Sequence, residues 1–147
     1  MNNNLKVKKI KAFATLPKRA TEGSAGFDLF AALKEPIDIS PGKICMIPTG
    51  IAISIDNPSY LGMICARSGL SVKHGITLAN GVGIIDSDYR GEIFIGLHNI
   101  SSKTYEITPN QRIAQLIIMP ILYTGITETD HLNETERGQG GFGSTGK

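Results

Sequence analysis

Short runs of isoleucine, leucine and valine recur along the chain, separated by turn-forming residues such as glycine, proline and asparagine. Within some runs the large apolar residues alternate with smaller ones, as at Ile51, Ile53 and Ile55. Alternation with a period of two places every second side chain on the same face of a β-strand. The pattern predicts these strands: Ile37 to Ile39, Ile44 to Ile47, Ile51 to Ile55, Leu61 to Cys65, Ile76 to Leu78, Ile93 to Leu97 and Ile113 to Met119.

Helical periodicity is nearly absent, and only the segment from Ser68 to His74 could form a short helix. Pro41-Gly42 and Asn57-Pro58 are among the turn signals that cut the chain into pieces of strand length. The stretch from Asn80 to Gly83 could close a hairpin, because asparagine and glycine tolerate a positive φ. Together these features predict an all-β fold, a β-sandwich or a barrel-like jelly roll.

The length of 147 residues and the hydrophobic content of 41% fit one globular domain with an apolar core. A formal net charge of +2 provides no large basic excess, so we expect no nucleic-acid partner. The apolar stretches are too short to cross a membrane, and the first residues lack a secretory apolar region. We expect a soluble, cytoplasmic protein that has no membrane partner.

Five segments carry residues suited to chemistry as well as to scaffolding. They are AGFDLFA (25–31), ARSGLS (66–71), NGVGIIDSDYRGEI (80–93), NQRIAQLI (110–117) and RGQGGFGSTG (137–146). Asp28 either caps a turn or places a magnesium ion, which binds few carboxylates and keeps its waters. Arg67, Ser68 and Gly69 together offer a cation, a hydroxyl and an open backbone N–H for phosphate oxygens, whereas the alternative is a helix cap at Ser68.

Asp86 and Asp88 are two residues apart beside Tyr89. In an extended segment the two carboxylates would share one face and Tyr89 would occupy the other, although carboxylates clustered in a turn are usually only solvated. Gln115 interrupts an apolar run, and an amide on the buried side of a strand needs partners, either backbone groups or a ligand.

The C-terminal segment from Arg137 is rich in glycine, and its one large apolar residue is Phe142. Such a segment cannot hold a strand or helix unaided and is either a disordered tail or a lid that closes over a ligand. We therefore predict a β-barrel domain over residues 1–136 and a flexible lid over residues 137–147.

In their order and spacing, the five segments resemble the motifs of the trimeric, all-β dUTPase family. One departure is Ala66, where many relatives have proline. The resemblance implies a distorted jelly-roll or β-barrel subunit of the β-clip type, and a homotrimer whose active sites are shared between subunits. It also implies Mg²⁺-assisted hydrolysis of dUTP to dUMP and pyrophosphate, which limits uracil in DNA and supplies dUMP for thymidylate synthesis.

The resemblance assigns roles to individual residues. Asp86 becomes the catalytic base that deprotonates the attacking water, and Asp28 becomes the residue that places Mg²⁺ through a water molecule. Arg112 becomes a structural residue in an ion pair. The residues expected to bind substrate are Arg67, Ser68, Gly69 and Gln115 on the phosphates; Asn80, Gly83, Ile84, Ile85, Tyr89 and Phe94 around the uracil and deoxyribose; and Arg137, Phe142, Gly143, Ser144 and Thr145 in the lid.

Two other functions compete with dUTP hydrolysis. A dCTP deaminase, or a bifunctional dCTP deaminase and dUTPase, has the same fold, but these enzymes lack a tail like RGQGGFGSTG. A β-barrel that binds nucleotide without catalysis would not need the base Asp86. The sequence therefore favours the dUTPase.

Overall fold

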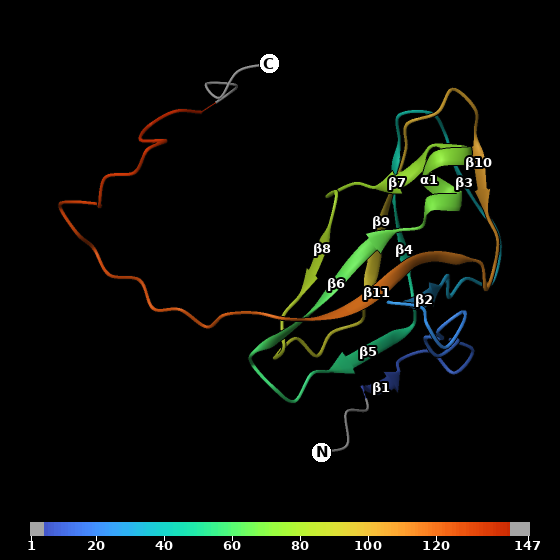
Figure 1. Cartoon of the computed structure of the whole chain (residues 1–147). Coiled ribbons are helices and arrows are strands. Elements are labelled where there is room, and N and C mark those ends of the chain that lie inside the picture. The colour runs from blue at the N-terminus through green and yellow to red at the C-terminus, as the bar shows by residue number, and fades with distance from the viewer. Residues whose placement is uncertain (1–4, 142–147) are drawn as a thin grey trace.

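The computed structural model describes residues 5–141, and nearly all of its regular structure is antiparallel β-sheet (Figure 1). This confirms the all-β prediction. The elements are β1 (Lys6–Lys9), β2 (Phe27–Phe30), β3 (Ile37–Ile39), β4 (Ile44–Pro48), β5 (Ile51–Ser54), β6 (Tyr60–Ala66), α1 (Ser68–His74), β7 (Ile76–Leu78), β8 (Gly83–Ile85), β9 (Phe94–Asn99), β10 (Tyr105–Ile107) and β11 (Arg112–Pro120).

The strands form a distorted jelly roll of small sheets around one apolar core. The largest sheet has the order β2-β11-β6-β8, and a second sheet has the order β4-β9-β7. Two strand pairs, β1 with β5 and β10 with β3, complete the body. The inward positions are almost all isoleucine, leucine and alanine, and Ile39, Ile107 and Leu116 are fully buried. Ile39 and Ile107 lie on the paired strands β3 and β10, whereas Leu116 lies on β11 of the largest sheet, so these side chains join two sheets through the core.

The helix α1 occupies the predicted segment, from Ser68 to His74. Arg67, in extended conformation, precedes it without a capping side chain, so Ser68 is the first helical residue and the helix cap at Ser68, the alternative considered for this tripeptide, is not formed. The helix ends at Gly75, whose φ of 66° lies in the left-handed region. In residues 5–141 no helix is long and apolar enough to cross a membrane.

The structure adds strands that the apolar runs did not predict, namely β1, β2, β8 and β10. It also corrects the hairpin expected at Asn80 to Gly83, because β7 pairs with β9 whereas β8 pairs with β6. Beyond β8, a turn closed by the N–H of Tyr89 on the carbonyl of Asp86 replaces the extended segment considered for the two aspartates.

The last strand, β11, ends at Pro120, and the chain then leaves the body as a long arm (Figure 1). We refer to residues 121–141 as the arm; no strand or helix lies within it. Its large apolar side chains are strongly exposed, with Leu122 at 89%, Tyr123 at 81% and Ile126 at 100%. The boundary predicted at residue 136 falls inside this arm, and residues 142–147 lie outside the described part of the chain.

The loop between β9 and β10 is held by the fully buried Asn99 side chain. Its amide donates to the carbonyls of Ile39 and Lys103, each at 2.7 Å, and its oxygen accepts the backbone N–H of Ser101 at 2.9 Å. A buried carbonyl or N–H that loses its hydrogen-bond partner costs free energy. The Asn99 side chain therefore stabilises the place where β9, β3 and the loop after β9 meet.

We predict that Asn99→Ala lowers the free energy of unfolding by about 2–4 kcal/mol, because it leaves buried backbone groups of Ile39 and Ser101 without partners. Urea unfolding followed by circular dichroism measures this loss. Asn133→Ala, at an exposed position of the arm, is the matched control and should change the unfolding free energy little. Equal stability of the two variants would contradict the role of Asn99.

Candidate active site

A cleft of about 360 Å³ opens beside β8 and the start of β9. Its lining combines two carboxylates, two aromatic rings and several apolar side chains, a composition suited to a flat, partly polar ligand. The lining residues are Met46, Ile84, Ile85, Asp86, Tyr89, Glu92, Ile93 and Phe94. Five of them, Ile84, Ile85, Asp86, Tyr89 and Phe94, belong to the set that the sequence analysis selected.

Tyr89 is held across the cleft by two contacts. Its hydroxyl donates to the carbonyl of Glu92 at 3.0 Å. Its ring covers Gly91 so closely that a Cβ built at Gly91 would lie 2.4 Å from the Tyr89 hydroxyl oxygen. Only glycine at position 91 leaves room for the ring in this position, which gives the cleft a rigid aromatic side.

Asp86 lies at the end of β8, where the chain turns, and its carboxylate is exposed. Its carbonyl accepts the N–H of Tyr89 at 3.1 Å. Arg90 fixes the same turn, because its guanidinium donates to the carbonyls of Ser87 at 2.6 Å and Tyr89 at 2.9 Å. The backbone of the turn is thus held while the Asp86 carboxylate stays open to solvent.

The far wall of the cleft is anchored to the core through Glu92 and Ile93. The Glu92 carboxylate accepts the N–H of Gly50 at 2.9 Å and lies 3.6 Å from the Lys11 ammonium. The buried Thr49 hydroxyl donates to the carbonyl of Ile93 at 2.7 Å. These contacts fix the chain on which Tyr89 rests.

Sequence reasoning missed four residues of this site: Met46, Gly91, Glu92 and Ile93. Gly91 and Glu92 belong to the segment NGVGIIDSDYRGEI. Their position next to Tyr89 in the sequence could have indicated that they belong to the site. Met46 enters the site because Pro48 of β4 pairs with Phe94 of β9, a long-range register with no local signature.

Asn80 and Gly83 lie at the other end of β8 and do not line the cleft. A Cβ at Gly83 would lie 2.9 Å from Cβ of Ile64 and 3.6 Å from the Asn80 amide nitrogen. Glycine therefore lets β8 approach β6 closely, and Asn80 borders this contact.

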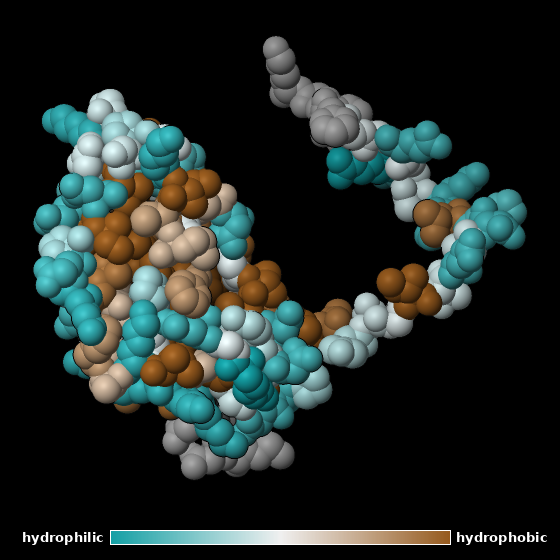
Figure 2. Space-filling model, turned by 180° about the vertical axis from the view of Figure 1, so that it is seen from behind, coloured by the Kyte–Doolittle hydropathy of each residue, from teal (hydrophilic) through white to brown (hydrophobic). Residues whose placement is uncertain are grey.

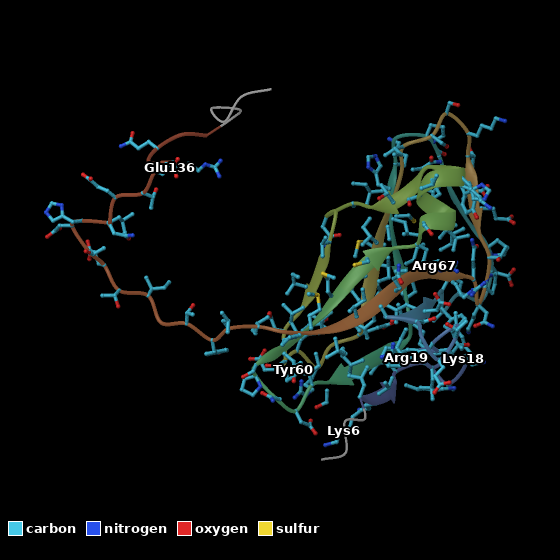
Figure 3. The ribbon with its side chains drawn as sticks, viewed as in Figure 1. Lys6, Lys18, Arg19, Tyr60, Arg67 and Glu136 are labelled. Atoms are coloured by element: carbon cyan, nitrogen blue, oxygen red, sulfur yellow. The ribbon has the colours of Figure 1, made fainter. Side chains whose placement is uncertain are left out.

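A second group of predicted residues surrounds Asp28 and consists of Asp28, Arg67, Ser68, Gly69 and Gln115. We call it the phosphate cluster, after the phosphate-binding role that the resemblance implies for Arg67, Ser68, Gly69 and Gln115. The Asp28 carboxylate lies between two guanidinium groups, with Nε of Arg67 at 3.1 Å from one oxygen and a terminal nitrogen of Arg112 at 3.1 Å from the other. This confirms the structural ion pair predicted for Arg112. Figure 3 shows Arg67 at the end of β6, next to β2.

These contacts orient the Arg67 guanidinium without using all of its N–H donors. A second hydrogen bond joins its terminal nitrogen to the carbonyl of Arg112 at 3.2 Å. A guanidinium carries five N–H donors, so three remain for an anion. The N–H groups of Ser68 and Gly69 lie in the first turn of α1, where no carbonyl of the helix can accept them. Arg67, Ser68 and Gly69 therefore offer several N–H donors close to one another at the start of α1.

Gln115 joins the phosphate cluster through the sheet. It pairs with Asp28 of β2 on one side and with Cys65 of β6 on the other. Its amide nitrogen donates to the carbonyl of Ala66 at 3.2 Å. The amide oxygen lies 3.3 Å from a Cβ built at Gly26, so the side chain is confined beside the strand ends.

The cleft and the phosphate cluster lie at opposite ends of β6. Ile85, which precedes Asp86, pairs with Gly62, whereas Arg67 follows Ala66. Gly62 and Ala66 are four residues apart, roughly 13 Å at the rise of a β-strand, and both functional side chains lie beyond these points. Within one chain, Asp86 and Arg67 cannot contact the same phosphate group.

Within residues 5–141, no group of three or more His, Cys, Asp or Glu side chains could hold a metal ion. The Asp28 oxygens each accept one hydrogen bond from an arginine and retain lone pairs. The donor set therefore fits a magnesium ion that brings waters and phosphate ligands of its own, which Asp28 would meet through a water.

In the arm, the Arg137 guanidinium donates to the carbonyl of Gly140 at 2.9 Å. Figure 3 shows the preceding residue, Glu136, far from Arg67. The predicted lid residues Phe142, Gly143, Ser144 and Thr145 lie outside the described residues.

Comparison with known proteins relates the chain to one family. A family model described as dUTPase matches residues 12–146. The deoxyuridine 5'-triphosphate nucleotidohydrolase of Paraburkholderia xenovorans is 46% identical over 147 residues, which are 100% of this chain and 99% of that protein.

Two solved structures from phages share the fold. A mutant dUTPase of Staphylococcus bacteriophage 80alpha with dUpNHpp has a TM-score of 0.89 and 28% identity, covering 99% of this chain and 100% of that one. A mutant dUTPase from phage phi11 of S. aureus, described with a structural Mg(II) ion, has a TM-score of 0.81 and 25% identity, covering 90% and 100%.

We predict that Gly91→Ala displaces the Tyr89 ring, because the new Cβ would overlap the hydroxyl. The loss of the exposed hydrogen bond between Tyr89 and Glu92 should lower the unfolding free energy by about 0.5–1 kcal/mol. Thermal unfolding measures the loss, and a crystal structure of the variant shows the ring position. Gly23→Ala is the matched control, since a Cβ there meets nothing within 4 Å. A variant Gly91→Ala with an unmoved ring and normal stability would refute this contact.

Proposed function

The chain belongs to the dUTPase family and is a dUTP diphosphatase, and from this premise we propose how its residues divide the reaction. The observation that carries the proposal is the exposed Asp86 carboxylate at the rim of a cleft shaped by Tyr89. We propose that the reaction limits uracil in DNA and supplies dUMP for thymidylate synthesis.

In the proposed mechanism, Asp86 holds a water molecule against the α-phosphorus of dUTP. A carboxylate oxygen of Asp86 takes a proton from this water as its oxygen bonds to phosphorus. The bond between the α-phosphorus and the bridging oxygen to the β-phosphorus breaks, and pyrophosphate leaves with that electron pair. The products are dUMP and pyrophosphate. The fixed turn around Asp86 supports this role, because it keeps the base at one place while its carboxylate stays free.

Tyr89 and its neighbours select the nucleoside. The uracil lies along β8, where backbone groups from Gly83 to Ile85 and the Asn80 amide read the edge of the base. The Tyr89 ring packs on the deoxyribose and leaves no room for a 2'-hydroxyl, a role supported by its rigid attachment to Gly91 and Glu92. Phe94 borders the same cleft. A pocket built from fixed hydrogen-bonding groups rejects a mismatched base strongly.

The phosphate cluster receives the triphosphate. Arg67, Ser68 and Gly69 supply charged and neutral N–H donors, and Gln115 supplies its amide. Asp28, which keeps Arg67 in place, is the residue that would hold a magnesium ion through a water, and the ion would supply charge neutralisation on the pyrophosphate. In the arm, Arg137 and the residues Phe142, Gly143, Ser144 and Thr145 close over the nucleotide.

A complete site requires a second copy of the chain. The attacking water and the phosphates must meet within about 3–3.5 Å, whereas Asp86 and Arg67 lie at opposite ends of β6. We infer that the phosphate cluster of one subunit faces the cleft of another, within a homotrimer.

Two apolar surfaces support this assembly. The arm carries Leu122, Tyr123, Ile126 and Leu132 almost fully exposed, and among residues 5–141 no other side chain covers them. Figure 2 shows further apolar side chains gathered on one face of the body. Exposed apolar residues of the body include Ile44, Met46 and Phe94, on β4 and β9. Contiguous exposed apolar surface is typical of protein interfaces.

The alternative functions are less well supported. The matched family model and the full-length bacterial relative are both dUTPases, so dCTP deamination is not favoured. A binding module without catalysis has no use for an unpaired carboxylate at the rim of its cleft.

We predict that Asp86→Asn lowers kcat for dUTP by at least roughly 10²-fold while dUTP still binds, because the amide keeps the shape of the side chain but cannot accept the proton. Pyrophosphate release from dUTP, dCTP, dTTP and UTP by the wild type tests the function itself, and calorimetry with dUTP tests binding to the variant. Asp88→Asn, an exposed neighbour outside the cleft lining, is the control and should stay active. Near-normal turnover by Asp86→Asn would contradict the assignment of Asp86 as the catalytic base.

We predict that two inactive proteins, Asp86→Asn and Arg67→Gln, recover activity when they are refolded together. A site works when its cleft comes from the Arg67→Gln chain and its phosphate cluster from the Asp86→Asn chain. Random assortment satisfies both conditions in about one site in four. Pyrophosphate release measures the recovery, and each variant refolded alone is the control. If verified mixed assemblies stay inactive, both groups belong to the same chain's site.

A further inference from the structure

Lys18 lies directly beside the phosphate cluster. It forms an isolated antiparallel β-bridge with Asp28, in which the N–H of Asp28 donates to the carbonyl of Lys18 at 2.7 Å and the N–H of Lys18 donates back at 3.3 Å. Residues paired in this way carry their side chains on the same face of the sheet. Lys18 therefore shares the face from which the Asp28 carboxylate reaches Arg67 and Arg112.

The next residue, Arg19, fixes this orientation. Its guanidinium lies 4.3 Å from the centre of the Phe27 ring and donates to the carbonyl of Ser24. Phe27 precedes Asp28, so its side chain faces the opposite side of the strand. The pairs Arg19–Phe27 and Lys18–Asp28 thus occupy opposite faces, and Lys18 stays on the side of the phosphate cluster.

The Lys18 ammonium is available for an anion. The side chain is exposed, and within residues 5–141 no carboxylate lies within 4.0 Å of its nitrogen. Asp28, opposite Lys18 in the bridge, already faces two guanidinium groups at 3.1 Å. Figure 3 shows Lys18 and Arg67 on the same side of the body. A lysine carries a compact charge on a flexible stem and can reach a phosphate oxygen without a fixed geometry.

We propose that Lys18 is a further substrate-binding residue, whose ammonium contacts the outer phosphate oxygens of dUTP held by Arg67. The inference rests on the proposed function, since it takes the phosphate cluster as the place of the triphosphate. Lys18 touches neither the attacking water nor the α-phosphorus. It therefore adds affinity for the triphosphate and leaves the chemical step unchanged.

The first test compares Lys18→Met with the wild-type protein in dUTP hydrolysis. The KM should rise roughly three- to tenfold, the size expected for one exposed charge, while kcat stays within about twofold. The KM should also depend less on salt, because one screened attraction is lost. Lys18→Arg keeps the charge and should restore the KM. Lys103→Met, on the loop between β9 and β10, is the control for loss of a surface lysine.

The second test measures binding without turnover. Calorimetry with inorganic tripolyphosphate should show weaker binding to Lys18→Met by a similar factor, whereas deoxyuridine, which lacks phosphate, should bind both proteins equally. Unchanged KM and unchanged tripolyphosphate affinity would overturn the proposal. If Lys18 had only a structural role, Lys18→Met would lower the melting temperature or weaken the binding of deoxyuridine as much as that of tripolyphosphate. Either result would also overturn the proposal. Failure of the wild type to hydrolyse dUTP would refute the proposed function, and the tripolyphosphate titration would still decide the role of Lys18.

Discussion

The register of β11 between β2 and β6 is the constraint on which the rest of the site depends. This strand pairs with β2 through Gln115 and Asp28 and with β6 through Gln115 and Cys65. The two pairings bring side chains from distant parts of the sequence to one place at the end of β6. A slip of one residue would turn Gln115 toward the core and a buried apolar neighbour toward the phosphates. The apolar core thus enforces the geometry of a polar site.

The wall of the cleft from Asp86 to Glu92, by contrast, depends on local structure, and only Met46 enters the lining through the distant pairing of β4 with β9. The turn after β8 is closed by the hydrogen bond between Tyr89 and Asp86, and Gly91 makes room for the Tyr89 ring. All of these residues come from one short segment, which Glu92 ties to the core through Gly50. A carboxylate and an aromatic ring can therefore be placed accurately by a few neighbouring residues, whereas the phosphate cluster requires three strands.

The same difference explains what the sequence could predict. The isoleucine-rich strands and the helix from Ser68 to His74 were predicted because their patterns are local. Strands such as β2 and β8 were missed, since FDLF lacks the β-branched residues and GII lacks the alternation that mark IDI and ITL. Both strands exist through their pairing with β11 and β6. The turn at Asn80 was read as a hairpin because a positive φ at Gly81 serves any tight turn and does not say which strands pair. Residue types identified the chemistry, but the separation of Asp86 from Arg67 depends on a register that no local pattern encodes.

The exposed apolar side chains of the arm link the state of this protein to its concentration. In the shared-site arrangement that we propose, Leu122, Tyr123 and Ile126 become buried only when subunits associate. The stability that their burial adds therefore depends on the protein concentration. Isolated chains then fold but hold incomplete sites. Activity should rise more steeply than the amount of protein while chains are scarce and become proportional to it once assembly is complete. A cell that makes this chain would thus acquire dUTP hydrolysis above a threshold of expression rather than in simple proportion to it.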